Sequence, residues 1–297
     1  MKILITGANG FLGQHLSVYL KQKRFDVIAT SRGECRIASS FNIPYYPAEL
    51  TQRSDVEQLV SQTKPDVIIH SAAMSKPDEC ETDREKCVLH NVSATQFLLT
   101  AFEKHSNTNS HFIFTSTDFV FGEGGPHSEE DVPDPINFYG ESKLMAEKLF
   151  AETSVVFTIV RPVFMYGPVW SGLRSSYLQQ VKNALQQNQP IKAVSDQLRT
   201  PTYVYDVCKG IEQIIVGKKA GVYHLAGKNI LSPYQMALSV ADYFHLDRSL
   251  IEEVTLNSFF EAARRPLRSG LKIAKAQEQL GYDPVTFEEG IKLTFRH

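Results

Sequence analysis

Short apolar segments alternate with longer amphipathic ones along the first half of this 297-residue chain, and this alternation constrains the fold most strongly. The pattern predicts strands at 3–6, 25–30, 44–47, 66–71, 112–116 and 155–161. It predicts helices at 11–20, 54–63, 82–104 and from about 138 to 152. Strands that are apolar on both faces are typical of a parallel sheet covered by helices on either side. We therefore expect an α/β protein with a Rossmann-type, doubly wound parallel sheet.

A glycine cluster lies between the first predicted strand and the first predicted helix. Its members are Gly7, Asn9, Gly10, Phe11, Leu12 and Gly13. Glycine permits a tight turn and a close approach of the backbone to a pyrophosphate, and the N-terminus of the following helix favours the anion. A plain glycine turn is the alternative. The position between a strand and an amphipathic helix favours a dinucleotide site formed by these six residues.

The end of the second predicted strand bears on which dinucleotide is bound. An acid there binds the ribose 2′-hydroxyl of NAD, whereas an arginine accommodates the 2′-phosphate of NADP. This chain has Ser31 and Arg32 at that point, with no acid before Glu34. We therefore expect NADP(H) to be preferred and NAD(H) to be possible, although Arg32 could also be a solvated loop cation. Glu49 and Leu50 are expected near the adenine, with a solvated surface acid as the alternative for Glu49.

Tyr139 and Lys143 are the candidate catalytic residues, because side chains four apart on a helix share a face. A lysine ammonium beside a phenol is expected to lower the tyrosine pKa from about 10, so that the phenol can exchange a proton with a substrate oxygen. A half-exposed amphipathic pair is the alternative. Thr117 follows the strand at 112–116, and its hydroxyl could donate to the same oxygen. Its alternative role is to cap a turn.

Small or polar residues stand at or just beyond the ends of five predicted strands. They are Gly7, Ser31, Ala72, Thr117 and Arg161. Cofactors of parallel sheets lie beyond the carboxyl ends of the strands. The coincidence predicts one site at this edge of the sheet.

The regular alternation fades after about residue 166. Helices are predicted at 171–189 and 233–244, and a strand at 221–226. We expect residues 1–166 to form the NADP-binding domain. Residues 167–297 are expected to form mainly a smaller substrate-binding lobe, with some segments returning to the sheet.

Composition excludes several classes of function. The net charge of −2 gives no basic field for nucleic acid, and no 18-residue apolar run is present to span a membrane. The four cysteines lack CxxC spacing and the nine histidines lack metal-ligand spacing, so neither a metal site nor a disulfide framework is expected. With no signal peptide recognised, we expect a cytoplasmic protein with reduced cysteines.

These residues resemble the extended short-chain dehydrogenase/reductase superfamily and, more closely, its dTDP-4-dehydrorhamnose reductases. The likeness extends through most of the chain and is strongest from residue 1 to about 167. It is carried by the glycine cluster, His70-Ser71-Ala72-Ala73, Asn91, the run 116–121, the run 139–143, Arg161, Tyr166-Gly167, Asp196-Gln197 and Pro201-Thr202. The run 116–121, STDFVF, is the most discriminating, because sugar-nucleotide epimerases usually differ there.

The resemblance implies a Thr117–Tyr139–Lys143 triad that delivers hydride from NADPH to C4 of a 4-keto-6-deoxy sugar nucleotide, in the biosynthesis of deoxysugars and cell-surface polysaccharides. It implies cofactor contacts by Ala72, Ala73, Asn91, Tyr139, Lys143 and Arg161, with Asn91 shaping the active-site helix. It implies substrate contacts by Met74, Asp118, Phe164, Arg199 and Thr202. A homodimer is compatible with it.

The chain departs from these reductases at two substrate positions. Phe164 stands where a tryptophan is common, and Arg199-Thr200 replaces a smaller, neutral stretch. Arg199 could bind a diphosphate or be a surface cation, so the sugar and the nucleotide stay open. Two alternative functions also stay open: an epimerase or dehydratase of the same superfamily, and a non-catalytic NADP-binding regulatory subunit. An epimerase retains NAD, for which an acid after the second strand would be expected.

Overall fold

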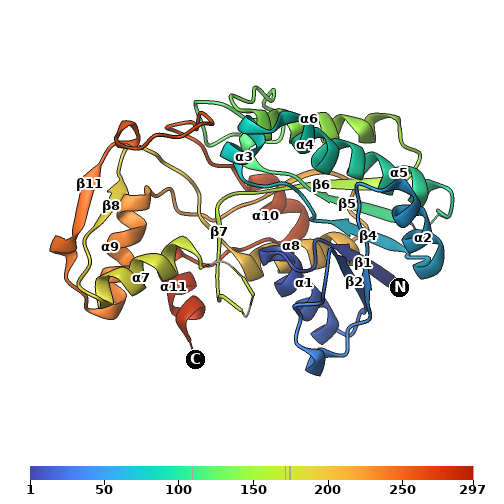
Figure 1. Cartoon of the computed structure of the whole chain (residues 1–297), viewed down its shortest axis with the longest axis horizontal. Coiled ribbons are helices and arrows are strands. Elements are labelled where there is room, and N and C mark those ends of the chain that lie inside the picture. The colour runs from blue at the N-terminus through green and yellow to red at the C-terminus, as the bar shows by residue number, and fades with distance from the viewer. Residues whose placement is uncertain (109, 171, 174, 297) are drawn as a thin grey trace.

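The computed structural model describes residues 1–108, 110–170, 172–173 and 175–296, and a seven-stranded parallel sheet lies at its centre (Figure 1). The strand order is β10-β6-β5-β4-β1-β2-β3, and every neighbouring pair is parallel. The strands are β1 (Lys2–Thr6), β2 (Asp26–Ser31), β3 (Tyr45–Pro47), β4 (Val67–His70), β5 (His111–Thr115), β6 (Val156–Pro162) and β10 (Gly221–Leu225). The predicted fold class is confirmed. The strand order reverses between β1 and β4, which is where such sheets bind their ligands.

Helices cover both faces of this sheet, because successive strand residues point to opposite sides. Ile3 and Ile5 pack with α1 (Phe11–Gln22), α8 (Val204–Val216) and α10 (Ala274–Leu280). Leu4, between them, packs on the other face. The helices there are α2 (Arg53–Thr63), α5 (Ala94–Glu103) and α6 (Phe138–Lys148). In Figure 1, α8 and α1 lie on one side of the strands and α5 and α6 on the other.

The helix predicted at 82–104 is present from Arg84 to Glu103, but a π-helical turn divides it into two α-helical segments. The structure has α3 (Pro77–Thr82), α4 (Arg84–Val88), a π-helical turn (Leu89–Ser93) and then α5. Asp83 interrupts the first two, because its side chain accepts a hydrogen bond from Lys86 N and so caps α4. The π-helical turn contains Asn91. Such turns often mark functional sites.

A smaller lobe, drawn on the left of Figure 1, has its own apolar core. Its elements are β7 (Met165–Tyr166), α7 (Tyr177–Gln186), β8 (Ile191–Val194), β9 (Thr202–Tyr203), α9 (Pro233–Phe244), β11 (Ile251–Val254) and α11 (Phe287–Phe295). The helix predicted from 171 begins later, at Tyr177, where the Ser176 side chain accepts from Gln179 N; residue 171 itself lies outside the described residues. After residue 166 the chain also returns to the sheet through α8, β10 and α10. None of the helices in the described ranges is long and apolar enough to cross a membrane.

Candidate active site

A cleft of about 840 Å³ opens beyond the carboxyl ends of the strands. The predicted residues that line it are Gly7, Asn9, Gly10, Phe11, Leu12, Gly13, Ser31, Arg32, Glu49, Leu50, Ala72, Ala73, Thr117, Asp118, Tyr139, Lys143, Phe164 and Arg199. The structure therefore brings most of the predicted cofactor and substrate residues to one cavity. Met74, Asn91, Arg161 and Thr202 do not line it. Their functional roles, like those of the residues that do, stay predictions.

The glycine cluster forms the turn that begins α1. Gly7 has a φ of +67°, and a Cβ on it would lie 2.6 Å from the backbone nitrogen of Ala72. A Cβ on Gly13 would overlap the carbonyl oxygen of Gly7. Gly10 is the N-cap of α1 and supplies no side-chain hydrogen bond to the helix. The turn therefore has no room for side chains, and the N-terminus of α1 is left for an anion. Both features fit the pyrophosphate of a dinucleotide.

The loop after β2 is held in place by Asn9. Its Nδ2 donates to the carbonyl oxygens of Arg32 (3.2 Å) and Glu34 (2.8 Å), and its Oδ1 accepts from Arg36 N (2.9 Å). The Arg32 guanidinium is mostly exposed and lies 3.9 Å from a carboxylate oxygen of Glu49. Glu49 is thus both a lining residue of the cleft and the partner of Arg32. The arrangement presents a cation where a 2′-phosphate would be recognised.

Several lining residues were missed by the sequence analysis: Arg36, Ser75, Phe119, Gly172, Leu173 and Ser176. Arg36 Nη1 donates to the carbonyl oxygen of Gly172 at 2.9 Å, which joins the loop after β2 to the segment before α7. A second arginine in the loop that carries Arg32 was a signal that could have revealed it. Gly172, Leu173 and Ser176 belong to no such motif, because only the tertiary fold brings them to the cleft.

Thr117, Tyr139 and Lys143 reach the cleft from two neighbouring elements. Thr117 follows β5 and its Oγ1 accepts from Phe119 N at 3.2 Å, so the hydroxyl also caps the short turn 118–120. Tyr139 and Lys143 lie on α6, whose N-cap Asn137 accepts from Gly140 N at 2.9 Å. A Cβ on Gly140 would overlap the carbonyl oxygen of Phe119. Glycine therefore lets α6 pack directly on the turn that carries Thr117.

The expected effect of Lys143 on Tyr139 is wrong for this structure. Burial raises the pKa of Tyr139 above its ordinary value of 10.0, and only a hydrogen-bonding contact with Thr117 opposes the rise. Lys143 donates instead to the carbonyl oxygen of Thr115 at 2.7 Å and stands 3.9 Å from the centre of the Phe114 ring. Burial lowers the pKa of Lys143 to about 7. Desolvation thus outweighs the ammonium charge that the sequence argument relied on.

Asn91 and Met74 lie outside the cleft, close to Tyr139 and Ser142 of α6. Asn91 accepts from Met74 N (2.8 Å), donates to Met74 O (3.1 Å) and donates to Ser142 Oγ on α6 (2.9 Å). Cys80 and Cys87 pack beside them against Tyr139. Asn91 therefore joins the π-helical turn to α6. This position supports the predicted role in shaping the active-site helix, but it brings neither residue to the cleft.

Arg161 is held away from the cleft by a buried ion pair. Its Nη2 and Nε donate to the two carboxylate oxygens of Glu147 at 2.6 and 3.0 Å. The pair joins the end of β6 to α6, and both side chains are almost fully buried. Breaking such a pair leaves an uncompensated buried charge. Arg161 is thus placed to hold the helix that carries Tyr139, and the structure does not bring it to the cofactor position that the resemblance implied.

The other end of the cleft contains Asp118, Phe164 and Arg199. Arg199 is 9% exposed, so the alternative of a surface cation is wrong. Its guanidinium carbon lies 5.7 and 5.8 Å from the ring centres of Phe119 and Phe164. Phe164 has a φ of +27°, a strained value for a side chain of this size. Thr202 is buried nearby, where its hydroxyl donates to Thr200 O and accepts from Gly227 N.

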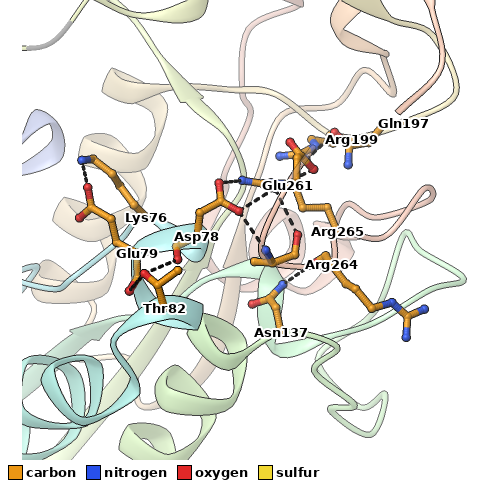
Figure 2. A network of polar contacts seen from close by, with 11 residues as sticks. Lys76, Asp78, Glu79, Thr82, Asn137, Gln197, Arg199, Glu261, Arg264 and Arg265 are labelled. Atoms are coloured by element: carbon orange, nitrogen blue, oxygen red, sulfur yellow. Dashed lines mark hydrogen bonds and ion pairs between the residues drawn. The ribbon is translucent and has the colours of Figure 1, made fainter. Parts of the chain in front are cut away.

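A segment near the C-terminus, residues 261–271, crosses beside this end and is called the strap here. Figure 2 shows its attachments: Asp78 on α3 pairs with Arg265, and Asn137 at the start of α6 donates to the carbonyl oxygen of Arg264. The two distances are 2.7 and 2.8 Å. Arg265 also pairs with Glu261 within the strap at 2.6 Å. The strap is thus anchored to the helix that carries Tyr139.

Comparisons with known proteins agree with this architecture. A family model described as the RmlD substrate binding domain matches residues 1–297. The spore coat polysaccharide biosynthesis protein SpsK of Bacillus subtilis is 30% identical over 293 residues, which cover 98% of this chain and 95% of that protein. Methionine adenosyltransferase 2 subunit beta of Rattus norvegicus is 30% identical over 298 residues, which cover 98% of this chain and 86% of that protein.

A solved structure is similar over nearly the whole length. It is the crystal structure of dTDP-4-dehydrorhamnose reductase from Bacillus anthracis in complex with NADP, with a TM-score of 0.85 and 27% identity. The match covers 99% of this chain and 98% of that one. The resemblance deduced from the sequence is confirmed, and the chain belongs to the RmlD substrate-binding domain family of extended short-chain dehydrogenase/reductases.

Proposed function

We propose that the protein is an NADPH-dependent reductase of a 4-keto-6-deoxy sugar nucleotide, of the dTDP-4-dehydrorhamnose reductase type. One observation carries the proposal: Thr117, Tyr139 and Lys143 line the same cleft as the glycine turn. The reductase from Bacillus anthracis in complex with NADP supports both the substrate class and the cofactor. The cytoplasmic location and the homodimer stay predictions.

The residues at the glycine end fit NADP. The close packing of Gly7 and Gly13 and the N-terminus of α1 suit a pyrophosphate. Arg32 and Arg36 line the cleft beside Ser31 and suit a 2′-phosphate. When bound, NADPH supplies the hydride for the carbonyl carbon of the substrate.

The chain itself supplies the proton and the donors. Tyr139 keeps its proton at neutral pH because burial raises its pKa, and a protonated phenol is what reduction of a carbonyl requires. The Thr117 hydroxyl is a second donor for the oxygen on which negative charge develops. Lys143 lies one helical turn from Tyr139 and, with a pKa of about 7, can take up and release a proton near neutral pH. It can therefore take part in restoring the proton of the phenol.

A second candidate is a non-catalytic regulatory subunit, which is favoured by the 30% identity to methionine adenosyltransferase 2 subunit beta. Such a protein could keep the fold and the cofactor cleft without turnover. The complete Thr117–Tyr139–Lys143 set favours catalysis over this candidate. The epimerase or dehydratase is less well supported, because Ser31 and Arg32 stand where an acid for NAD would be expected.

One assay separates these functions. The purified chain is mixed with NADPH and dTDP-4-dehydro-L-rhamnose, and the absorbance of the reduced cofactor is followed. We expect NADPH to be consumed, and we expect Tyr139→Phe to lower the rate at least about 100-fold while NADPH binding is unchanged. Tight NADPH binding with no turnover of any keto-sugar nucleotide would contradict the reductase and favour the regulatory subunit.

A further inference from the structure

Arg199 is fixed in the wall of the cleft and has hydrogen-bonding capacity to spare. Its backbone exchanges two hydrogen bonds with Leu231, at 3.0 and 2.8 Å. Its Nη2 donates to Gln197 Oε1 at 2.6 Å, and Gln197 is itself held by a hydrogen bond to the carbonyl oxygen of Pro266 at 3.2 Å. Its buried Nε finds no partner among the described residues. A buried guanidinium donor without a partner is costly, so this arrangement is suited to a ligand that completes it.

Asp118 provides the complementary acceptor at the same end of the cleft. It is 5% exposed, and burial raises its pKa while the positive charge of Arg199 opposes the rise. The same attraction opposes the fall in the pKa of Arg199 that burial causes. No ion pair joins the two side chains in the part of the chain that the structure describes. They therefore compensate each other's charge without occupying each other's hydrogen-bonding sites.

The position of the pair identifies the part of the substrate that it faces. Asp118 follows Thr117 directly, and the Thr117 hydroxyl donates to its Oδ1 at 3.3 Å. The Arg199 guanidinium lies near the rings of both Phe119 and Phe164. A carbonyl that reaches Thr117 and Tyr139 therefore brings the sugar ring, not a distant diphosphate, beside Asp118 and Arg199.

The charge balance also disfavours a diphosphate at this point. The nearest further cation, Arg265, is engaged by Asp78 and Glu261 (Figure 2). Two cations, Arg199 and Arg265, thus face three carboxylates, those of Asp118, Asp78 and Glu261. Among these five groups positive charge is not in surplus, and Asp118 would repel a diphosphate. A neutral hydroxyl group needs one acceptor and one donor, and this pair offers both.

We propose that Asp118 and Arg199 bind the hydroxyl group on the carbon next to the carbonyl of the sugar. Asp118 accepts a hydrogen bond from this hydroxyl group, and Arg199 donates one to its oxygen. The inference rests on the proposed function, because it is the keto group that places the ring. It makes the pair a determinant of substrate specificity. It also replaces the expectation that Arg199 binds a diphosphate.

A binding experiment that needs no turnover tests the assignment. Protein saturated with NADPH is titrated with dTDP and, separately, with dTDP-L-rhamnose, for the wild type and for Arg199→Met. We expect the Kd for dTDP to stay within about 2-fold and the Kd for dTDP-L-rhamnose to rise at least about 10-fold. An equal rise in the Kd for both ligands would overturn the proposal, because it would indicate that Arg199 binds the diphosphate.

Turnover of a substrate analogue gives an independent test. The analogue is the keto-sugar nucleotide that lacks the hydroxyl next to the carbonyl. We expect the wild type to prefer the hydroxylated substrate at least about 100-fold in kcat/KM, and Arg199→Met to lose most of that preference. Arg32→Ala removes an arginine from the other end of the same cleft, and this variant is expected to keep the preference for the hydroxylated substrate. Equal use of the two substrates by the wild type would overturn the proposal.

Two further controls keep the outcomes separate. If Arg199→Met unfolds at a lower temperature than the wild type, Arg199→Lys takes its place. Lysine keeps the positive charge beside Asp118 but loses the planar fork of donors. The same split between dTDP and dTDP-L-rhamnose is then expected, and its absence would overturn the assignment. Failure of the wild type to reduce any keto-sugar nucleotide would contradict the proposed function, whereas the binding comparison would still decide what Arg199 contacts.

Discussion

The two ends of the cleft are built in different ways. The cofactor end is local: the turn from Gly7 to Gly13 and the loop from Ser31 to Arg36 follow consecutive strands, and Arg32 is largely exposed. The substrate end is assembled from segments far apart in the sequence, with Asp118, Phe164 and Arg199 beside the strap. Asp118 and Arg199 are buried and compensate each other's charge, and Arg265 is paired with the partly exposed Asp78.

The difference teaches what each end can recognise. A large anion needs backbone donors and accessible cations, and the cofactor end offers the N-terminus of α1 and the exposed Arg32. A neutral sugar needs fixed donors and acceptors in a dry, shaped wall, and buried opposite charges supply these. The proposed catalytic residues, Thr117, Tyr139 and Lys143, line the same cleft as both ends. Each prediction below changes one end and asks whether the other is affected.

The largest effect is expected where the two ends meet, at Lys143. Lys143→Met is expected to lower kcat roughly 100- to 1,000-fold, because the variant loses the side chain that can restore the proton of the Tyr139 phenol. With a pKa of about 7 for Lys143, the wild-type rate of reduction is expected to fall as the pH rises through that value. Arginine stays protonated, so any activity left in Lys143→Arg is expected to lack this pH limb. The measurement is steady-state NADPH oxidation from pH 6 to 9.

Lys143 is also expected to make stability depend on pH, in the direction opposite to that of the rate: stability rises with pH where the rate falls. The pKa of Lys143 is about 7 in the folded protein, against an ordinary value of 10.5. The unfolded chain therefore binds the proton more tightly, and the contribution of Lys143 to the free energy of unfolding rises with pH between about 7 and 10.5. Comparison with Lys143→Met isolates this contribution. A wild-type stability curve parallel to that of the variant over this range would contradict a lowered pKa.

The next effect concerns the backbone of the cofactor end. Gly7 and Gly33 have nearly equal φ values, +67° and +69°, but a Cβ at Gly7 would lie 2.6 Å from Ala72 N, whereas one at Gly33 meets nothing within 4 Å. Both alanine variants should lose about 1–2 kcal/mol to the left-handed backbone. Gly7→Ala should lose a further ~1–3 kcal/mol to overpacking. Equal free energies of unfolding for the two variants would show that close approach is unimportant at Gly7.

This contrast also explains which parts could be predicted from the sequence. The glycine turn and the Tyr139–Lys143 spacing depend on neighbours in the chain, and short motifs therefore revealed them. The approach of Leu173 and Ser176 to the cleft and the Asp78–Arg265 pair depend on segments that only the tertiary fold brings together. The buried state of Arg199 and the raised pKa of Tyr139 depend on solvent exclusion, which spacing does not encode.

Substitution of Arg32 tests whether the exposed cations of the cofactor end determine the preference for NADP over NAD. Arg32→Ala is expected to raise the Kd for NADPH roughly 10-fold and to leave that for NADH unchanged, because only NADPH carries the 2′-phosphate. Arg53→Ala removes an exposed arginine from α2, outside the cleft, and serves as the control. Fluorescence titration measures both constants. Equal effects on the two cofactors would remove the basis for preferring NADP, and an altered affinity for dTDP would show that the two ends are coupled.

The smallest effect is expected from the anchor of the strap. Asp78→Asn keeps an oxygen that can accept from Ala263 N, which now donates to Asp78 Oδ1 at 2.9 Å, so the variant removes mainly the charge opposite Arg265. An ion pair this exposed is worth about 0.2–1 kcal/mol and weakens with added salt. Its hydrogen bond with Arg265 lowers the pKa of Asp78. The stabilisation should therefore be complete above the ordinary carboxyl pKa and be lost as the pH falls through the lowered value.

The strap prediction also separates the two ends of the cleft. Because the strap lies beside Arg199 and not beside the glycine turn, Asp78→Asn is expected to raise the KM for the sugar nucleotide about 2- to 5-fold, in proportion to the small energy of the pair, without changing NADPH affinity. Glu57→Gln, which removes an exposed carboxylate paired with Arg53 and Lys104, should change neither constant. An equal change in NADPH affinity would mean that the strap stabilises the whole cleft, and the distinction between a local cofactor end and an assembled substrate end would then fail.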